Sequence, residues 1–442
     1  MKGPQVVLTL VLVGAIALQA LLPRFRLLIV TTAAGLSCLL STLLGTAKTP
    51  QLLAEAPWDV LIILIGLGLL SEVLVASRLF GILAVWSAEK SRASPRRVLL
   101  FFAIGLYGVS GLVNNLTALL LVLPVLLILL KLMGVDQRHT SWTLGVLLVA
   151  CNLGGAATPI GDFPAILLLG RGSMSFSGYL VHAAPPTALA LLLVLAVVLL
   201  FVRPDRELKH SALAESLSVA VIKKLYRSVR LDRQVLLPTL GLLGLMLLAW
   251  LLIPTSTGIT PELICWIGVA AALLCRPALA ERLLRTRVDF EAALFLLGLF
   301  LMVGAVRRTG LFADFAAGLS RLPVAPWAQL VLFLILSGVT TGIFSAGPSM
   351  AALLEVAEGL AHRFPPSAVY VGLALSVCAG SSLLLTAATS GPLLQTLAER
   401  AQLRSQQGTQ IHFGFFDFLP VGLLSYTIIQ SVAIVYVLWA TQ

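Results

Sequence analysis

The chain has 442 residues, of which 59% are hydrophobic and only 11% are charged, and its formal net charge is +11. Soluble domains average about 25% charged residues, so this composition excludes a soluble globular protein. The lysines and arginines lie in short segments between apolar runs, which is typical of membrane proteins and excludes nucleic-acid binding as their role. Because apolar runs of about 17 to 25 residues recur along the chain, we predict an all-α polytopic membrane protein.

The first half of the chain contains five apolar runs that we expect to cross the membrane. Between the third and fourth of them, residues 97–133 read as two apolar arms around "SGLVNNLTA", with basic residues at both ends. We predict a re-entrant helical hairpin here, since a non-helical tip inside a membrane needs protein or water around it. His182 is expected in a loop before the fifth crossing. The predicted crossings are 4–23, 27–46, 58–76, 141–169 and 184–202.

A more polar segment, residues 203–233, follows the first half. It contains "ESLSVAVIKKLYRSVRL", where apolar residues recur at helical spacing with Lys and Arg between them. This pattern predicts an amphipathic linker helix on the cytoplasmic membrane surface. The second half then repeats the order of the first, with a second hairpin at about 326–362. Its predicted crossings are 235–253, 262–276, 290–306, 368–397 and 418–440.

Matching features of the two halves recur at one offset. Ser110 matches Ser337 and Cys151 matches Cys378, and both differences (337 − 110 and 378 − 151) equal 227. Five crossings per unit is an odd number, so the second unit must be inverted relative to the first. We therefore predict two inverted repeats, 1–202 and 234–442, each with five transmembrane helices and one hairpin. Basic loops agree with this topology, with Arg307, Arg308 and Arg321 as exceptions on the opposite side.

The stretch "ACNLGGAATPIGDFPAILL", residues 150–168, predicts a broken helix inside the membrane. Glycines let the backbone unwind, proline ends a helix, and a carboxylate in a membrane segment marks a functional site. Exposed carbonyl groups at such a break can coordinate Na⁺, and the helix N-terminus can attract an anion. The first candidate ion-binding residues are therefore Asn152, Gly154, Gly155, Thr158, Pro159, Gly161 and Asp162.

Hairpin tips and the second broken helix supply further polar groups. The first tip, "VNNLTA", carries amide and hydroxyl oxygens that suit alkali cations, and the second half is rich in hydroxyl groups but uncharged. For Na⁺ we expect Asn115, Thr117, Gly154 and Asp162 as ligands. The remaining candidates in these segments are Asn114, Ser345, Gly347, Ser349, Ser381, Ser382, Thr386 and Thr389.

These motifs resemble a known group, the ion transporter superfamily. It includes NhaD-type sodium/proton antiporters, divalent-anion/sodium symporters, citrate carriers, arsenite pumps and the melanosomal P protein. Residues 150–168 look like its N-x-G-G-x-x-T/S-P-I-G-D motif, and "VNNLTALLLVLPV" resembles the D-N-x-T hairpin tip of the antiporter and P-protein branches. "CAGSSLLLTAATSG" is similar to a stretch of NhaD-type antiporters. The detailed match covers these three motifs only.

The resemblance implies two inverted repeats, each with a hairpin and one discontinuous helix, and often a homodimer. It places Asn115 and Thr117 at the cation-binding positions of the hairpin, residues 154–162 on the first broken helix and 378–391 on the second. The chain differs from the motifs of the superfamily at two places. The aspartate of D-N-x-T is Asn114 here, and the second hairpin reads "GIFSAGPSM" without the S-N-T motif of the dicarboxylate branch.

Three functions remain open from the sequence. We expect a secondary active transporter of the bacterial inner membrane that exchanges Na⁺ for H⁺ by alternating access, with no cofactor beyond these coupling ions. The first alternative is a Na⁺-coupled symporter of a dicarboxylate or oxyanion, including an arsenite-type permease. The second is a transport-inactive scaffold or sensor. An enzyme is not expected, since no His/Glu metal cluster lies in a span and no nucleophile lies beside a base.

Overall fold

The computed structural model describes residues 3–22, 25–205, 212–226, 230–253, 257–405 and 407–442. All regular secondary structure within these ranges is helical, and the strand-like pairing there is limited to an isolated bridge between Arg404 and Gln410. Nine of the described helices are long and apolar enough to cross a membrane. An all-α multi-pass membrane protein is therefore confirmed. Arg24 and parts of the predicted 203–233 linker lie outside the described residues.

Helices of the first half form close to the predicted runs, because backbone polar groups in a membrane must be satisfied within each helix. The prediction for His182 was wrong: α10 begins at Phe176, so His182 lies inside the helix. The helices are α1 (Gly3–Leu21), α2 (Arg26–Leu43), α3 (Thr49–Ala54), α4 (Trp58–Ala76), α5 (Leu79–Ser91), α6 (Pro95–Ser110), α7 (Asn115–Met133), α8 (Gln137–Ala157), α9 (Phe163–Gly170), α10 (Phe176–Val197) and the π-helical turn η2 (Val198–Val202).

The second half contains the same kinds of element. The predicted crossing 262–276 forms only the 14-residue helix α13. At 1.5 Å per residue this helix is about 21 Å long, which is shorter than a bilayer core. The helices are α11 (Ala212–Leu225), α12 (Arg233–Leu252), α13 (Pro261–Leu274), α14 (Pro277–Thr286), α15 (Phe290–Arg307), α16 (Leu311–Ser320), α17 (Pro326–Phe344), α18 (Ala346–Leu360), α19 (Pro366–Ser381), α20 (Gly391–Arg400) and α21 (Phe415–Ala440).

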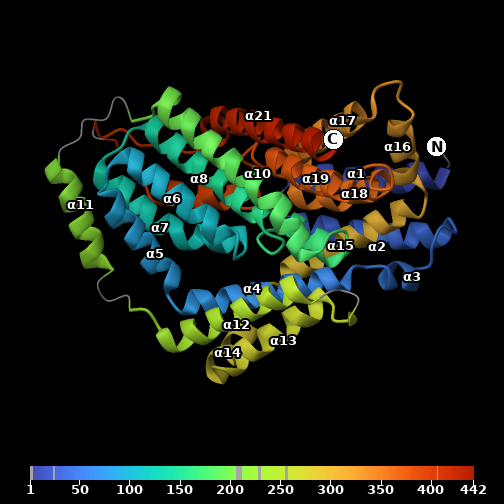
Figure 1. The fold of residues 1–442 in the computed structure, drawn as a ribbon, viewed down its shortest axis with the longest axis horizontal. Helices are drawn as coiled ribbons and strands as arrows, with labels where there is room; N and C mark the ends of the chain where they lie inside the picture. The colour runs from blue at the N-terminus through green and yellow to red at the C-terminus, as the bar shows by residue number, and fades with distance from the viewer. Residues whose placement is uncertain (1–2, 23–24, 206–211, 227–229, 254–256, 406) are drawn as a thin grey trace.

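Two helical hairpins enter the molecule from opposite ends. Figure 1 shows α6 and α7 on the side of α11, whereas α17 and α18 lie on the side of α3 and α16. We call these the α11 end and the α16 end. The first tip is a short turn closed by Asn114, whose side-chain oxygen accepts a hydrogen bond from the Leu116 amide (2.8 Å) and caps α7. The second tip consists of Ser345 alone.

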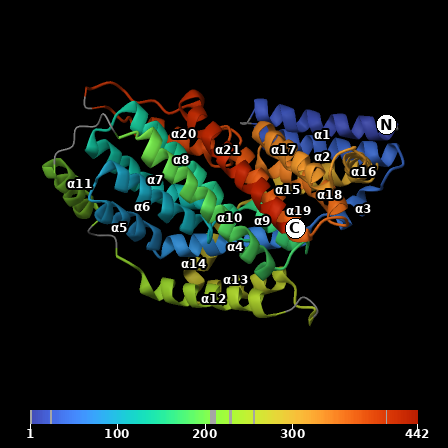
Figure 2. The same cartoon turned by 45° about the horizontal axis from the view of Figure 1, so that its top comes forward.

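Helices of the two halves pack against one another in matching pairs. The helix α2 of the first half lies along α15 of the second half. In the same way, the helix α13 of the second half lies along α4 of the first half. Within each half, the first hairpin arm lies along the first part of the broken helix, α6 along α8 and α17 along α19. Figure 2 shows α4, α12, α13 and α14 gathered along one side of the molecule. The broken helices therefore lie in the interior, between the hairpins and the last helices, α10 and α21.

Candidate functional site

The first broken helix is interrupted by five residues, 158–162, between α8 and α9. Thr158 is extended (φ −126°, ψ 154°) and ends α8, and Asp162 is the N-cap of α9. One carboxylate oxygen of Asp162, Oδ1, accepts a hydrogen bond from the Phe163 amide (2.9 Å). Its other oxygen, Oδ2, has no partner among the described residues. The break thus holds a carboxylate deep in the protein with half of its hydrogen-bonding capacity unused.

The tip of the first hairpin packs directly on this break. Thr158 Oγ1 donates a hydrogen bond to the carbonyl oxygen of Gly111 (2.5 Å). Gly155 lies between two predicted site residues: an ideal Cβ on it would be 2.9 Å from Asn115 Nδ2 and 2.8 Å from Asp162 Cβ. Only glycine fits at this distance, so the glycine allows the amide and the carboxylate to approach each other across the backbone.

Asn115 is fully buried behind Gly155. Its Oδ1 accepts a hydrogen bond from Ser110, whose hydroxyl also lies 2.8 Å from the carbonyl oxygen of Cys151. Its Nδ2 is a buried donor without a partner among the described residues. Buried polar groups are nearly always paired, so this amide points to a ligand or an ordered water at the hairpin tip.

A cavity of about 10 Å³, room for about one water molecule, lies between the two halves of the chain. Its walls come from the first break, from α10, from the start of α18 and from α19. The polar residues that line it are Asn152, Asp162, Tyr179, Cys378 and Ser381.

The side chains of Asn152, Ser381 and Tyr179 donate their hydrogens to other groups of the protein. Asn152 Nδ2 lies 3.3 Å from the carbonyl oxygen of Ser381 and 3.2 Å from Ser382 Oγ. Ser381 donates its hydroxyl to the carbonyl oxygen of Cys378 (2.9 Å), and Tyr179 donates its own to that of Ala156 (2.9 Å). Oxygen lone pairs and the Asp162 carboxylate are therefore left for an occupant.

Among the predicted site residues, the structure brings Asn152, Asp162 and Ser381 together at the cavity. Of the four predicted Na⁺ ligands, only Asp162 is in the lining. Gly154 and Gly155 are buried in the last turn of α8, so the backbone there is helical and not unwound as expected. Pro159 and Gly161 are buried within the break, and Thr117 is half-buried outside the cavity. Gly347 packs against Phe163 at the start of α9. Exposed positions, away from the cavity, are occupied by Asn114, Thr386 and Thr389.

Sequence reasoning did not select Tyr179 or Cys378 as lining residues. Tyr179 is almost fully buried one turn into α10, at a position before the predicted crossing 184–202 that was expected to lie in a loop. Cys378 was used only as a marker of the repeat. A tyrosine and a cysteine carry no local signal of a site, so only the packing of α10 and α19 against the break identifies them.

Ser345 has an unusual backbone at the second hairpin tip, with φ +73° and ψ 162°. Non-glycine residues rarely adopt this region, and such conformations cost about 1–3 kcal/mol. We expect Ser345→Gly to raise stability by about 1 kcal/mol, because the relieved strain exceeds the roughly 0.5–1 kcal/mol that glycine loses in chain entropy. Thermal unfolding in detergent tests this. Ser345→Ala keeps the strain and should not stabilise; equal melting temperatures for both variants would contradict the explanation.

A model of the citrate transporter family matches residues 8–364. The chain belongs to this family. Citrate transporter family members are part of the ion transporter superfamily, so the resemblance inferred from the motifs is confirmed, and the protein is a membrane transporter and not an enzyme.

The chain is also similar to other transporters. The chain is 29% identical over 369 residues to an uncharacterised transporter of Mycobacterium tuberculosis, with 82% of each chain covered. It is 24% identical over 310 residues to sodium/proton antiporter 1 of Arabidopsis thaliana, covering 67% of this chain and 50% of that protein. The YdaH transporter of Alcanivorax borkumensis has a similar fold, with TM-score 0.61, 18% identity, and 99% and 98% of the two chains covered.

Proposed function

We propose that this citrate transporter family member exchanges Na⁺ for H⁺ across the bacterial inner membrane by alternating access. The observation that supports this most is the set of groups facing the cavity. Asp162 Oδ2, Asn152 Oδ1 and Ser381 Oγ present lone pairs, because the available donors of these side chains are used elsewhere. Among its described lining residues the cavity has no Lys, Arg or His. This chemistry favours a small cation over an anion.

The proposed exchange uses Asp162 for both ions. As a carboxylate it would bind Na⁺ together with the oxygens of Asn152 and Ser381, and as a carboxylic acid it would carry a proton. The two states exclude each other, so one site facing the two sides of the membrane in turn gives antiport. Asn115, Thr117 and the backbone near Gly154 are proposed to shape the site from behind, through the contact between Asn115 and Gly155.

Two inverted repeats, 1–202 and 234–442, are proposed as the framework of this movement. The matching packing of α2 with α15 and of α13 with α4 supports the repeat, and so does the entry of the hairpins from opposite ends (Figure 1). In transporters built this way, substrate and ions bind near the middle of the membrane where the repeats meet. The cavity at Asn152 and Ser381 has that position between the halves.

Na⁺-coupled uptake of an anion is a second candidate. The first residues of α18 and α9, including Ala346 and Pro164, line the cavity, and helix N-termini attract anions. Ser349, in the first turn of α18, has a buried hydroxyl group without a partner among the described residues. The family description names citrate, which is such an anion. In the described conformation, however, the cavity holds only about one water molecule.

Reconstitution into liposomes with a trapped pH dye tests both candidates. An imposed Na⁺ gradient should change the internal pH without any added anion, and K⁺ should not replace Na⁺. Protein-free liposomes provide the baseline. Na⁺-dependent uptake of radiolabelled citrate, a dicarboxylate or arsenite, without a pH response in the absence of the anion, would instead establish symport. The absence of any flux would favour a scaffold or sensor.

A further inference from the structure

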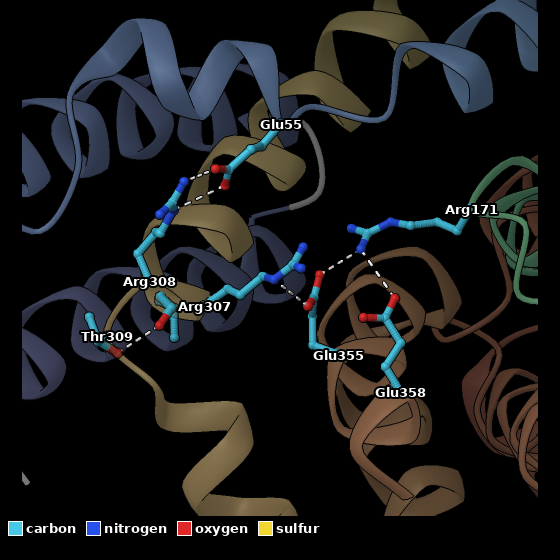
Figure 3. Close-up of polar contacts among 8 residues, drawn as sticks. Glu55, Arg171, Arg307, Arg308, Thr309, Glu355 and Glu358 are labelled. Carbon is cyan, nitrogen blue, oxygen red and sulfur yellow. Dashed lines mark hydrogen bonds and ion pairs between the residues drawn. The ribbon is translucent and has the colours of Figure 1, made fainter. Parts of the chain in front are cut away.

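Glu355 of α18 is a buried carboxylate held by two arginines from other parts of the chain. Its Oε1 lies 2.8 Å from Arg171 Nη1 and its Oε2 lies 3.1 Å from Arg307 Nε. Arg171 also contacts Glu358, at 3.4 Å. The Glu355 side chain is 3% exposed and that of Arg171 is 15% exposed. Figure 3 shows the two guanidinium groups reaching Glu355 from different helices.

These three charges join three separate segments at the α16 end. Arg171 directly follows α9, Arg307 is the last residue of α15, and Glu355 lies in the middle of α18. Exposed ion pairs contribute little, but a buried pair holds its partners firmly because separating them leaves an uncompensated charge in a poorly hydrated environment. Arg171, Glu355 and Arg307, which we call the triad, therefore fasten α9, α15 and α18 together.

The triad joins two helices that start at the cavity, at points well along each helix. Asp162 caps α9 and Ala346 begins α18, and both residues line the cavity. Arg171 follows Asp162 by nine residues, and Glu355 follows Ala346 by nine, so each is about 13 Å along its helix. α9 and α18 also pack on each other. An ion pair between Arg171 and Glu355 thus holds these two helices together on the side of the cavity that faces the α16 end.

Water is available where the triad would separate. Arg171 lines a cleft of about 760 Å³ whose lining is mixed and includes the polar residues Asp59, Ser175 and Glu262. When α9 and α18 part, the freed guanidinium group can be hydrated from this cleft. Glu355 and Arg171 are thus buried enough to hold the closed arrangement, whereas the Arg307 side chain is 49% exposed and adds the weaker contact. Arg171 also lines the cleft, so its guanidinium group can be hydrated once it is released.

We propose that Glu355 is a positioning residue that holds the ion site closed towards the α16 end, and that the triad separates when the site opens to that side. This inference rests on the proposed transport function. Alternating access requires one face of the central site to close while the other opens. The triad joins the two helices whose separation uncovers Asp162, so its release is the opening step.

The native Cys378 allows a test that does not depend on transport, because it lines the cavity and is 4% exposed. In a variant that keeps Cys378 and has the other four cysteines replaced by alanine, the rate of modification by a small membrane-impermeant methanethiosulfonate is measured. Glu355→Gln is expected to raise this rate at least about tenfold, which corresponds to about 1.4 kcal/mol. Each variant is first checked for a monodisperse elution profile in detergent.

Glu55→Gln is the matched control. Glu55 also pairs with an arginine at the α16 end, Arg308, but this pair involves neither α9 nor α18 (Figure 3). It should leave the modification rate of Cys378 unchanged. Arg171→Gln should act like Glu355→Gln, and Arg171→Lys, which keeps the charge, should remain near the parent rate; the arginine variants also cover the case in which Glu355→Gln fails to fold.

Two outcomes would overturn the inference: an unchanged modification rate in Glu355→Gln and Arg171→Gln, or an equal increase in Glu55→Gln. The test also separates this inference from the proposed function. Faster modification of Cys378 without any Na⁺ or anion flux would support the closure by the triad and reject the transport. Flux in the parent with an unchanged rate in the variants would reject the triad alone.

Discussion

Asp162→Asn is expected to reduce Na⁺-driven proton movement to the level of protein-free liposomes while leaving the protein folded. Asparagine has nearly the same shape, and its Oδ1 can still accept the hydrogen bond from the Phe163 amide that caps α9. It cannot ionise, so it can neither release a proton to make room for Na⁺ nor neutralise the ion. The measurement is the rate of internal pH change after a Na⁺ jump in reconstituted liposomes.

Asp289→Asn is the matched control for this prediction. Asp289 is also an N-cap aspartate, and its Oδ1 accepts a hydrogen bond from the Ala292 amide (2.9 Å) at the start of α15, but it is exposed and far along the chain from the break. The same chemical change there should leave the exchange rate intact. Retained, pH-dependent exchange in Asp162→Asn would contradict the role of Asp162 and redirect attention to anion symport.

Gly154→Ala, in the last turn of α8 before the break, is expected to cause a large loss of stability for so small a substitution. An ideal Cβ on Gly154 would lie 2.9 Å from the carbonyl carbon and from the Cα of Tyr107. These are backbone atoms of α6, which no side-chain rotation can move, so α6 and α8 must separate. Overpacking of this kind costs about 1–3 kcal/mol. Thermal unfolding in detergent should show the loss, together with slower exchange, since the hairpin tip moves away from Asp162.

Gly108→Ala provides the comparison on the opposing helix. Gly108 lies in α6, one residue after Tyr107, and an added Cβ there meets no atom within 4 Å. Alanine in a helix is favoured over glycine by roughly 0.5–1 kcal/mol, so this variant should be as stable as the parent or more stable. Equal melting temperatures for the two variants would show that α6 and α8 are not in close contact at Gly154.

Local features of the sequence predicted most of the fold and part of the site. Crossing 58–76 coincides with α4 because a run of apolar residues of that length has few alternatives in a membrane. The break between α8 and α9 was predictable because Pro159 and Asp162 are strong local signals. The short helices α14 and α16 were not predicted, since neither is long enough to stand out among the apolar runs.

Contacts between the two halves of the chain could not be predicted from the sequence. Asn152 and Ser381 are far apart in the chain and meet only after both broken helices pack together. Thr386 was a candidate because hydroxyl residues cluster near it, yet it is exposed, and burial is decided by neighbours that the local pattern does not contain. Arg307 was an exception to the charge rule for loops, and its partner in the structure is Glu355 of α18.

The packing of α2 on α15 and of α4 on α13 has a consequence for biosynthesis. When the first half has left the ribosome, α2 and α4 still lack these two partners, because α13 begins 203 residues after the start of α4 (261 − 58) and α15 begins 264 residues after the start of α2 (290 − 26). At roughly 5–20 residues per second, the wait lasts about ten to fifty seconds. During that time α2 and α4 are covered by lipid or by the insertion machinery. The packing of α2 on α15 and of α4 on α13 therefore forms only after the second half has entered the membrane, whereas contacts within the first half, such as that of α6 with α8, can form earlier. A ribosome stalled between the halves leaves one face of α2 and one face of α4 without their native partners.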